Sequence, residues 1–236
     1  MIESHLAKLR ARHPISADEE AAIRAAVAEV RHYPADHVFI HRGVELHHST
    51  LVLDGWACRF RDLRNGQRQI TELHVAGDFA DLHSFTLKRL DHDVMALTAL
   101  QVALVPHERL RAITERFPHL TRVYWFATNL DAAIHREWML SLGRRPAVAR
   151  LAALLCELCV RLEIVGRADI AGYALPLTQT DLAESLGLTN VHVNRTLGGL
   201  RAMGLVDVQN GRVTIHDWPG LTRVGEFDPS YLYLPA

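Results

Sequence analysis

The polar side chains best placed to read a nucleic acid lie within residues 178–206. Val193, Leu197 and Leu200 recur there at i, i+4 and i+7, which predicts a helix with one apolar stripe. If that stripe is buried, the opposite face is exposed. Its amides, arginine and methyl groups match the donors, acceptors and thymine methyl of the DNA major groove. The exposed and flanking residues of this face are Asn190, Val191, His192, Asn194, Arg195 and Gly198.

A shorter helix and a fixed bend precede this helix. Ala183 is small where two helices must approach closely, and Gly187 can adopt the left-handed backbone of the bend. Leu182, Leu186 and Leu188 supply the apolar contacts. The spacing predicts a helix-turn-helix, although a helical hairpin with a purely structural role would share some of these features.

Two short alternating runs follow, residues 205–208 and 212–215, separated by Asn210 and Gly211. An Asn-Gly pair between alternating runs predicts a type I′ hairpin. A helix-turn-helix followed by such a hairpin is a winged helix, and the rest of the chain must position it.

Composition narrows the class of protein. With 236 residues, 49% of them hydrophobic and 22% charged, the chain has the composition of an ordinary globular protein. A net charge of -1 weighs against a protein that coats DNA without specificity, but not against a dimer with a few local basic groups. We expect neither export nor membrane insertion, because no apolar stretch has the length to cross a bilayer.

The three cysteines, Cys58, Cys156 and Cys159, indicate no disulfide framework and favour a reducing cytoplasm. Cys156 and Cys159 have C-x-x-C spacing but lie within an apolar helical run, residues 148–162. Core packing is therefore favoured over a metal or redox site.

The N-terminal half predicts one helix and then a β-domain. Ser16 and Glu19 form a capping box for a helix that we expect to reach Val30 and to end at Pro34. Residues 38–105 are short apolar runs with evenly spaced turns, which predict about eight strands in an antiparallel roll with room for a ligand. These turns are Asp54-Gly55, Asn65-Gly66 and Ala76-Gly77.

A long helix is predicted over residues 119–142, with an apolar stripe in steps of three and four that is typical of a coiled-coil dimer. The alternative is that this stripe packs only onto the chain's own β-domain. Residues 143–146 predict a hinge, and residues 166–173 a polar link. The tail beyond residue 216 is expected to pack on the last domain. The stripe residues are Leu120, Val123, Ala127, Leu130 and Ile134, and Trp138 continues it.

The chain is thus expected to be an α+β protein. It would have an N-terminal jelly-roll-like domain (residues 1–118), a dimerisation helix (119–142) and a winged-helix domain with a tail (143–236). This order of parts resembles the Crp/Fnr family of bacterial transcription regulators, over residues 16–215. The match rests on residues 178–206 and on the Gly77-Asp78-Phe79 turn, followed by Thr98-Ala99 and Val102-Ala103. The resemblance implies a cytoplasmic homodimer that binds a palindromic operator, contacts RNA polymerase and changes the spacing of its winged helices with a sensory state.

Departures from the family pattern bear on the effector. In cyclic-AMP-binding members an Arg-Ser pair holds the phosphate, but here its place falls near Leu90 and Asp91. Asp91 and Asp93 would repel an anion, although Arg89 is close, so cyclic-nucleotide binding is not expected. The residues that match the family's effector turn are Gly77, Asp78, Phe79, Asp81, Leu82 and His83.

No metal or cofactor is assigned. An iron-sulfur cluster of the family's type needs clustered N-terminal cysteines, and none precedes Cys58. Haem stays open, because 15 histidines are present, but each is more commonly a plain surface or core residue. The candidates in the β-domain are His47, His48, His74, His83 and His92.

By position in the family, Arg195 would read guanine, Val191 would contact a thymine methyl group, and Asn190 would contact adenine or a phosphate. Thr178 and Thr180 match positions that hold phosphates, although Thr178 could simply cap its helix and Asn194 could be a solvated surface residue. The full set of expected DNA contacts is Thr178, Thr180, Thr189, Asn190, Val191, His192, Asn194 and Arg195.

Two other classes of protein remain as alternatives. A cupin-like metalloenzyme needs converging histidines, but His47 and His48 are adjacent and would point to opposite faces of a strand. The sequence also lacks paired carboxylates, a nucleophile elbow and a phosphate loop, so we expect no enzyme. The other alternative is a small-molecule- or haem-binding sensor whose winged helix mediates protein contacts. The operator, the effector and the sign of regulation do not follow from the sequence.

Overall fold

The computed structural model describes residues 1–235. The chain divides into two compact units, the first built mainly from residues 1–61 and 72–132 and the second from residues 62–71 and 133–233. The division falls inside one long helix, α5 (Pro118–Arg144).

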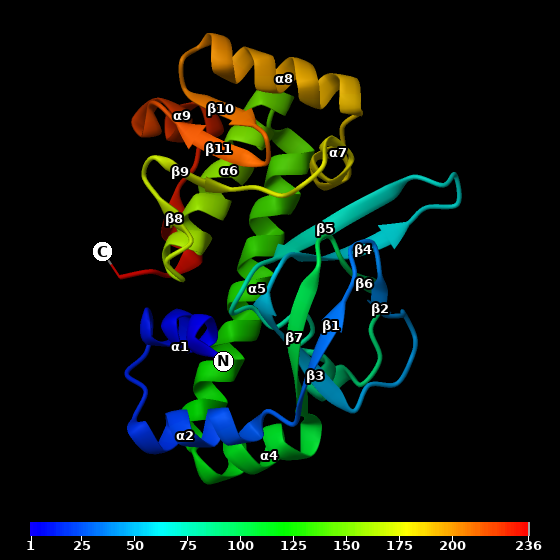
Figure 1. Ribbon diagram of the computed structural model, residues 1–236, viewed down its shortest axis with the longest axis vertical. Helices are drawn as coiled ribbons and strands as arrows, with labels where there is room; N and C mark the ends of the chain where they lie inside the picture. The colour runs from blue at the N-terminus through cyan, green and yellow to red at the C-terminus, as the bar shows by residue number, and fades with distance from the viewer. Residues whose placement is uncertain (236) are drawn as a thin grey trace. The chain divides into compact units, whose positions relative to one another are not determined.

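The β-domain contains two antiparallel sheets (Figure 1), with strand orders β1-β7-β3 and β2-β6-β4-β5. Aliphatic residues including Val52, Val94 and Val102 form a buried core cluster in this domain. This confirms the antiparallel roll, but residues 38–106 hold six described strands where about eight were predicted, and a further strand precedes them. The strands are β1 (Glu29–Tyr33), β2 (Val38–Ile40), β3 (His48–Asp54), β4 (Ala57–Asp62), β5 (Arg68–His74), β6 (Asp93–Ala96) and β7 (Leu100–Pro106).

The N-terminal helices differ from the prediction. The capping box is confirmed, since Glu19 N donates to Ser16 Oγ at 3.3 Å and Ser16 N donates to Glu19 Oε2 at 2.9 Å. However, α2 (Ala17–Ala26) stops short of Val30, which lies in β1 opposite Ala103 of β7. Ladder hydrogen bonds to β7 therefore override the helical pattern. An earlier helix, α1 (Glu3–Arg10), was not predicted.

Helix α3 (Ser84–Leu87) is one turn, and α4 (His107–Arg116) begins after Pro106, as expected. Helix α5 confirms the long helix but runs through Gly143. The break comes at Pro146, which has no amide hydrogen to continue the helical ladder and instead caps α6 (Ala147–Glu163). Cys156 and Cys159 are buried in α6, as core packing predicts.

The second unit contains the helix-turn-helix and a small sheet with the order β10-β11-β9-β8. The predicted polar link is instead two strands. The Tyr173 hydroxyl donates to Leu155 O at 2.8 Å, and a Cβ on Gly172 would lie 2.0 Å from Val213 O, so only glycine fits that close strand pairing. The remaining elements are β8 (Ala168–Asp169), β9 (Gly172–Ala174), α7 (Gln179–Leu186), α8 (Asn190–Ala202), β10 (Val206–Gln209), β11 (Arg212–Ile215), α9 (Trp218–Gly225) and η1 (Pro229–Leu232).

The C-terminal tail packs on α6, as expected. A Cβ on Gly225 would lie 2.7 Å from Ala153 N, which shows how closely α9 approaches α6. Tyr231 of η1 donates its hydroxyl to Glu157 Oε2 at 2.8 Å. Across the described residues, no helix combines the length and the apolar character that a membrane crossing requires.

Candidate nucleic-acid interface

Local chemistry sets both ends of α7. Thr178 is the N-cap, and its hydroxyl accepts from Asp181 N at 3.1 Å while Asp181 Oδ2 accepts from Thr178 N at 2.7 Å. Gly187 ends the helix with φ 62°, the left-handed conformation predicted for the bend. Thr189 then caps α8 by accepting from His192 N at 3.3 Å.

Helix α8 has the two faces that its periodicity predicts. Val193 and Leu200 are fully buried and Leu197 is half-buried. On the opposite face Val191 is 80% exposed, and the short polar residues beside it are exposed as well. These exposed residues are Asn190, Asn194, Arg195 and Gly198, while His192 is half-buried.

Side-chain hydrogen bonds join α7 to this exposed face of α8. Gln179 Nε2 donates to Asn194 Oδ1 at 2.7 Å, and Asn194 Nδ2 donates back to Gln179 Oε1 at 2.6 Å. Asn190 Nδ2 donates to Thr180 Oγ1 at 3.1 Å. Sequence reasoning missed Gln179, because its partner lies 15 residues away and only the bend brings the two amides together.

Two further residues that the sequence did not indicate hold the C-terminal end of α7. Gln69 Nε2 donates to Glu184 O at 2.7 Å, and Arg150 Nη1 donates to Leu186 O at 3.1 Å. Both bonds satisfy carbonyls that the last turn of a helix leaves without intrahelical partners. The first helix of the motif is thus anchored at both ends.

The wing is the predicted type I′ hairpin. Asn210 and Gly211 both have positive φ, 50° and 71°, as the turn requires. Val213 and Ile215 are buried, and Arg212 and Thr214 between them are exposed. The alternation packs one face of the hairpin and leaves the other in solvent.

Two family models match this chain, one in its C-terminal part and one in its N-terminal part. The model of the Crp-like helix-turn-helix domain matches residues 149–224, and that of the cyclic nucleotide-binding domain matches residues 30–117. FnrL, a transcriptional activator of Cereibacter sphaeroides, is 29% identical over 202 residues, covering 84% of this chain and 80% of FnrL. The nitrogen fixation regulation protein FixK of Bradyrhizobium diazoefficiens is 32% identical over 168 residues, covering 70% of this chain and 69% of FixK.

The chain belongs to the Crp/Fnr family. It is a DNA-binding transcription regulator and not an enzyme. The structure of FixK2 from Bradyrhizobium japonicum matches it with a TM-score of 0.76 and 25% identity, covering 84% of this chain and 97% of that one. A CRP/FNR-family regulator from Thermus thermophilus shares the fold with a TM-score of 0.65 and 20% identity, covering 84% of this chain and 98% of that one.

The turn that matches the family's effector turn contacts helix α1 of the same chain. His5 Nδ1 of α1 donates to Gly77 O at 3.0 Å, and Lys8 Nζ forms an ion pair with Asp78. The Phe79 ring meets the His5 ring edge-on at 5.1 Å. Asp78 and Phe79 thus already have partners within the chain, and ligand binding at this turn stays a prediction.

Asp81 lies at the centre of a buried polar network. Its Oδ1 accepts from Thr50 N at 2.5 Å, its Oδ2 lies 3.1 Å from Ser84 Oγ, and Ser84 Oγ lies 3.1 Å from His107 Nε2. Burial raises the pKa of Asp81 to about 7 and lowers the pKa of His107 to about 4. Of the other turn residues, Leu82 is buried and His83 is half-buried.

This network predicts a pH effect on stability. The unfolded Asp81 carboxyl ionises from about pH 4, whereas the folded carboxyl keeps its proton up to about pH 7. The free energy of unfolding therefore loses an Asp81 contribution as pH rises through this window. Asp81→Asn should remove that loss. In urea unfolding, the free energy of unfolding of the variant should therefore rise relative to that of the wild type as the pH rises. A difference that is constant with pH would contradict the buried, protonated carboxyl.

The residues expected at the place of the family's phosphate-binding pair make contacts within the chain. Arg89 pairs with Glu45 at 2.7 Å, and Asp91 Oδ1 lies 2.9 Å from His92 Nδ1. Leu90 is buried, and Asp93 Oδ1 accepts from Arg42 N at 3.0 Å. From the sequence, Arg89 was the cation considered for phosphate binding. It is instead paired with a carboxylate of the same chain.

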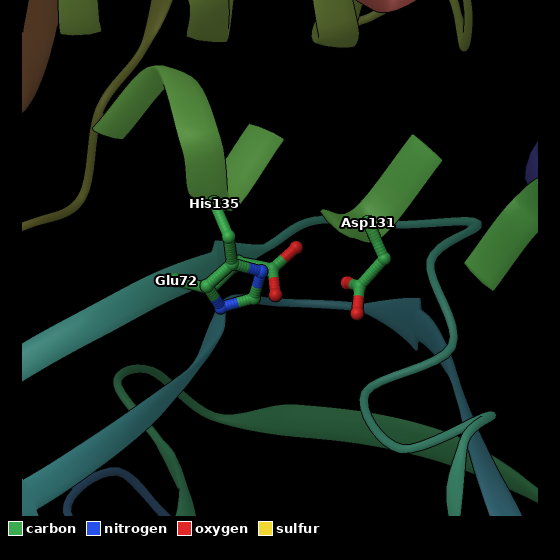
Figure 2. Close-up of side chains that lie close together, drawn as sticks. All are labelled: Glu72, Asp131 and His135. Carbon is green, nitrogen blue, oxygen red and sulfur yellow. The ribbon is translucent and has the colours of Figure 1, made fainter. Parts of the chain in front are cut away.

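A buried arginine that the sequence did not single out lies nearby in the same domain. Arg59 Nη1 donates to Glu72 Oε2 at 2.6 Å and to Asp131 Oδ2 at 2.8 Å. Figure 2 shows Glu72 of β5 and Asp131 of α5, with His135 one helical turn beyond Asp131. Burial alone would raise the pKa of Asp131, but the Arg59 guanidinium outweighs it and holds that pKa well below its usual range. The guanidinium thus compensates both carboxylates.

The candidate haem histidines are spread over the β-domain. His47 is exposed, His48 half-buried and His74 buried. The rings of His83 and His92 approach each other, with centroids 5.4 Å apart. Haem binding by any of these histidines stays a prediction.

The predicted dimer stripe packs on its own domain at its N-terminal end. Leu120 and Val123 are at most 1% exposed and belong to the core cluster of their own domain, against which Ala127 also packs. Ile134 is also buried and Leu130 is half-buried. Leu120, Val123 and Ala127 thus pack as the alternative interpretation of this stripe predicts, and dimerisation through the stripe stays a prediction.

Proposed function

We propose that the regulator binds a palindromic operator as a homodimer, with α8 of each copy in a major groove. The observation that carries this proposal is the exposed face of α8, where Val191, Asn194 and Arg195 stand opposite the buried Val193. Such a face presents donors, acceptors and a methyl surface to base edges. Family membership supports the DNA partner.

Each expected contact has a defined chemistry. Arg195 would donate two hydrogen bonds to guanine O6 and N7, and Val191 would cover a thymine methyl group. Thr178, Thr180 and the residues that open α8 lie at helix N-termini, where hydroxyls and amides can hold phosphates. We place the protein in the cytoplasm with its DNA and expect it to act through RNA polymerase.

For the dimer we propose a different stripe of α5, the exposed one. Trp125 is 66% exposed and Met139 is 70% exposed, which is unusual for such large apolar side chains. Trp125, Ala132 and Met139 recur every seven residues along α5. Between them, at steps of three and four residues, the same stripe carries polar residues. An apolar repeat with polar alternates is a coiled-coil seam with a built-in register. The polar members are Arg122, Asn129 and Arg136, all exposed.

We also infer that operator binding needs no cyclic nucleotide. Asp91 and Asp93 stand where the family's phosphate ligands would be, and Arg89 is paired with Glu45. Asp78 and Phe79 are engaged by α1. Adding cyclic AMP should therefore leave the operator affinity of the purified protein unchanged, and a large increase would contradict this inference.

Arg195→Ala tests the proposed function. Losing one bidentate contact should weaken specific binding by about 1–3 kcal/mol and relax the preference at one base position of each half-site. Selection from random duplex DNA, followed by titration on the selected operator, measures both effects.

Arg201→Ala is the matched control. Arg201 is also an exposed arginine of α8, but it pairs with Asp207 of the wing at 2.6 Å. The control should keep the selected sequence. If Arg195→Ala kept the parent's sequence preference and affinity, the assignment of α8 as the reading helix would fail.

A further inference from the structure

The amides of Gln179 and Asn194 form a closed ring at the surface of the helix-turn-helix. Each amide donates to the other, at 2.7 Å and 2.6 Å. Both residues are exposed, and Asn194 lies on the face of α8 that carries Arg195. The pair is therefore part of the surface offered to DNA, although one of its members belongs to α7.

The ring changes what either amide can read alone. A primary amide has two N–H donors and an oxygen with two lone pairs, and it reads adenine with one donor and one lone pair on the same edge. That edge of each amide is used up within the ring. Each amide keeps its second N–H and its second lone pair, and both point outward.

The free groups combine across the two residues. On each outer edge of the ring, the free N–H of one amide lies beside the carbonyl oxygen of the other, so that a donor and an acceptor are adjacent. A donor next to an acceptor complements adenine, which offers N7 as an acceptor and N6–H as a donor in the major groove. Guanine offers two acceptors there, so it would leave the amide oxygen facing a lone pair.

We propose that Gln179 and Asn194 act as one composite reader that selects an adenine in each half-site. Gln179 is thereby a specificity-determining residue outside the recognition helix. This inference rests on the proposed function, because it requires α8 to face the major groove. The second contact between the helices, Asn190 to Thr180, is a single hydrogen bond to a hydroxyl and forms no such ring.

The test begins with the operator that the wild-type protein selects from random DNA. Each adenine of a half-site is then replaced, one at a time, by 7-deaza-adenine, which lacks N7 but keeps Watson–Crick pairing. For one of these adenines, the replacement should weaken wild-type binding about tenfold, because the ring loses the N7 acceptor that it contacts. Gln179→Ala and Asn194→Ala should each abolish the penalty at that same adenine. The double variant should bind no more weakly than either single variant, because the ring is lost in all three.

Arg201→Ala is the control, since Arg201 is an exposed residue of α8 that pairs with Asp207 and lies outside the set of expected DNA contacts. It should keep the 7-deaza penalty at the same adenine. The inference is overturned if Gln179→Ala keeps that penalty, if the two single variants affect different bases, or if their effects add. A wild-type protein that selects no operator would refute the proposed function instead, so the two failures are distinct.

Discussion

In the proposed homodimer, Trp125→Glu is expected to separate the two copies. Trp125 is 66% exposed on α5, and in a two-fold dimer the substitution removes an anchor from both copies at once. Losing two such anchors should cost about 4 kcal/mol or more, roughly a thousandfold in the dimer dissociation constant. Sedimentation at micromolar concentration measures it, and operator affinity should fall in parallel because each monomer holds one half-site.

Ile170→Glu is the control for added charge and lost apolar surface. Ile170 is 71% exposed, which is close to the 66% of Trp125. It lies in the β8–β9 turn and not on α5. This variant should remain dimeric, and Met139→Glu should behave like Trp125→Glu. A Trp125→Glu protein that sediments with the wild type would rule out the exposed stripe of α5 as the seam.

Arg59→Met is expected to lower the free energy of unfolding by about 3–5 kcal/mol. The arginine side chain is 3% exposed, and its loss would leave Glu72, also 3% exposed, and Asp131 without their shared guanidinium. In the wild type, the depressed pKa of Asp131 contributes stability above its unfolded pKa, and this is lost as pH falls below about 4. Urea unfolding should therefore show a larger deficit at neutral pH than at acidic pH.

Arg61→Met is the matched control for this experiment. Arg61 follows Arg59 on the same strand, β4, but its side chain is 44% exposed and lies 3.9 Å from Asp91. An exposed ion pair contributes little, so this variant should change the free energy of unfolding by less than about 0.5 kcal/mol. Equal losses in the two variants would mean that the cluster around Arg59 is not what stabilises the domain.

Features that depend on a few consecutive residues were predictable. The left-handed Gly187 and the Asn210-Gly211 turn are local backbone requirements, and both occur as expected. The cap at Thr178, which was the alternative to a phosphate contact, is equally local. The two faces of α8 were predictable too, because helical periodicity assigns Val193 and Arg195 to opposite sides whatever else the chain does.

Partners distant in sequence were not predictable. Val30 continues a helical pattern but lies in β1, because β7 is available to pair with it. Gln179 meets Asn194, and Gln69 reaches the end of α7 across 115 residues. No periodicity in the sequence encodes contacts of this kind, since they depend on how separate elements are brought together.

Helix α5 shows most clearly which features follow from the sequence and which appear only in the folded chain. Residue spacing alone predicts a long helix, an apolar repeat along it and a winged helix beyond it. That repeat exists twice on α5, once through Leu120 and Val123 and once through Trp125 and Met139. The difference between the two stripes appears only in the folded chain, because the domain's own core buries Leu120 and Val123 and leaves Trp125 and Met139 exposed.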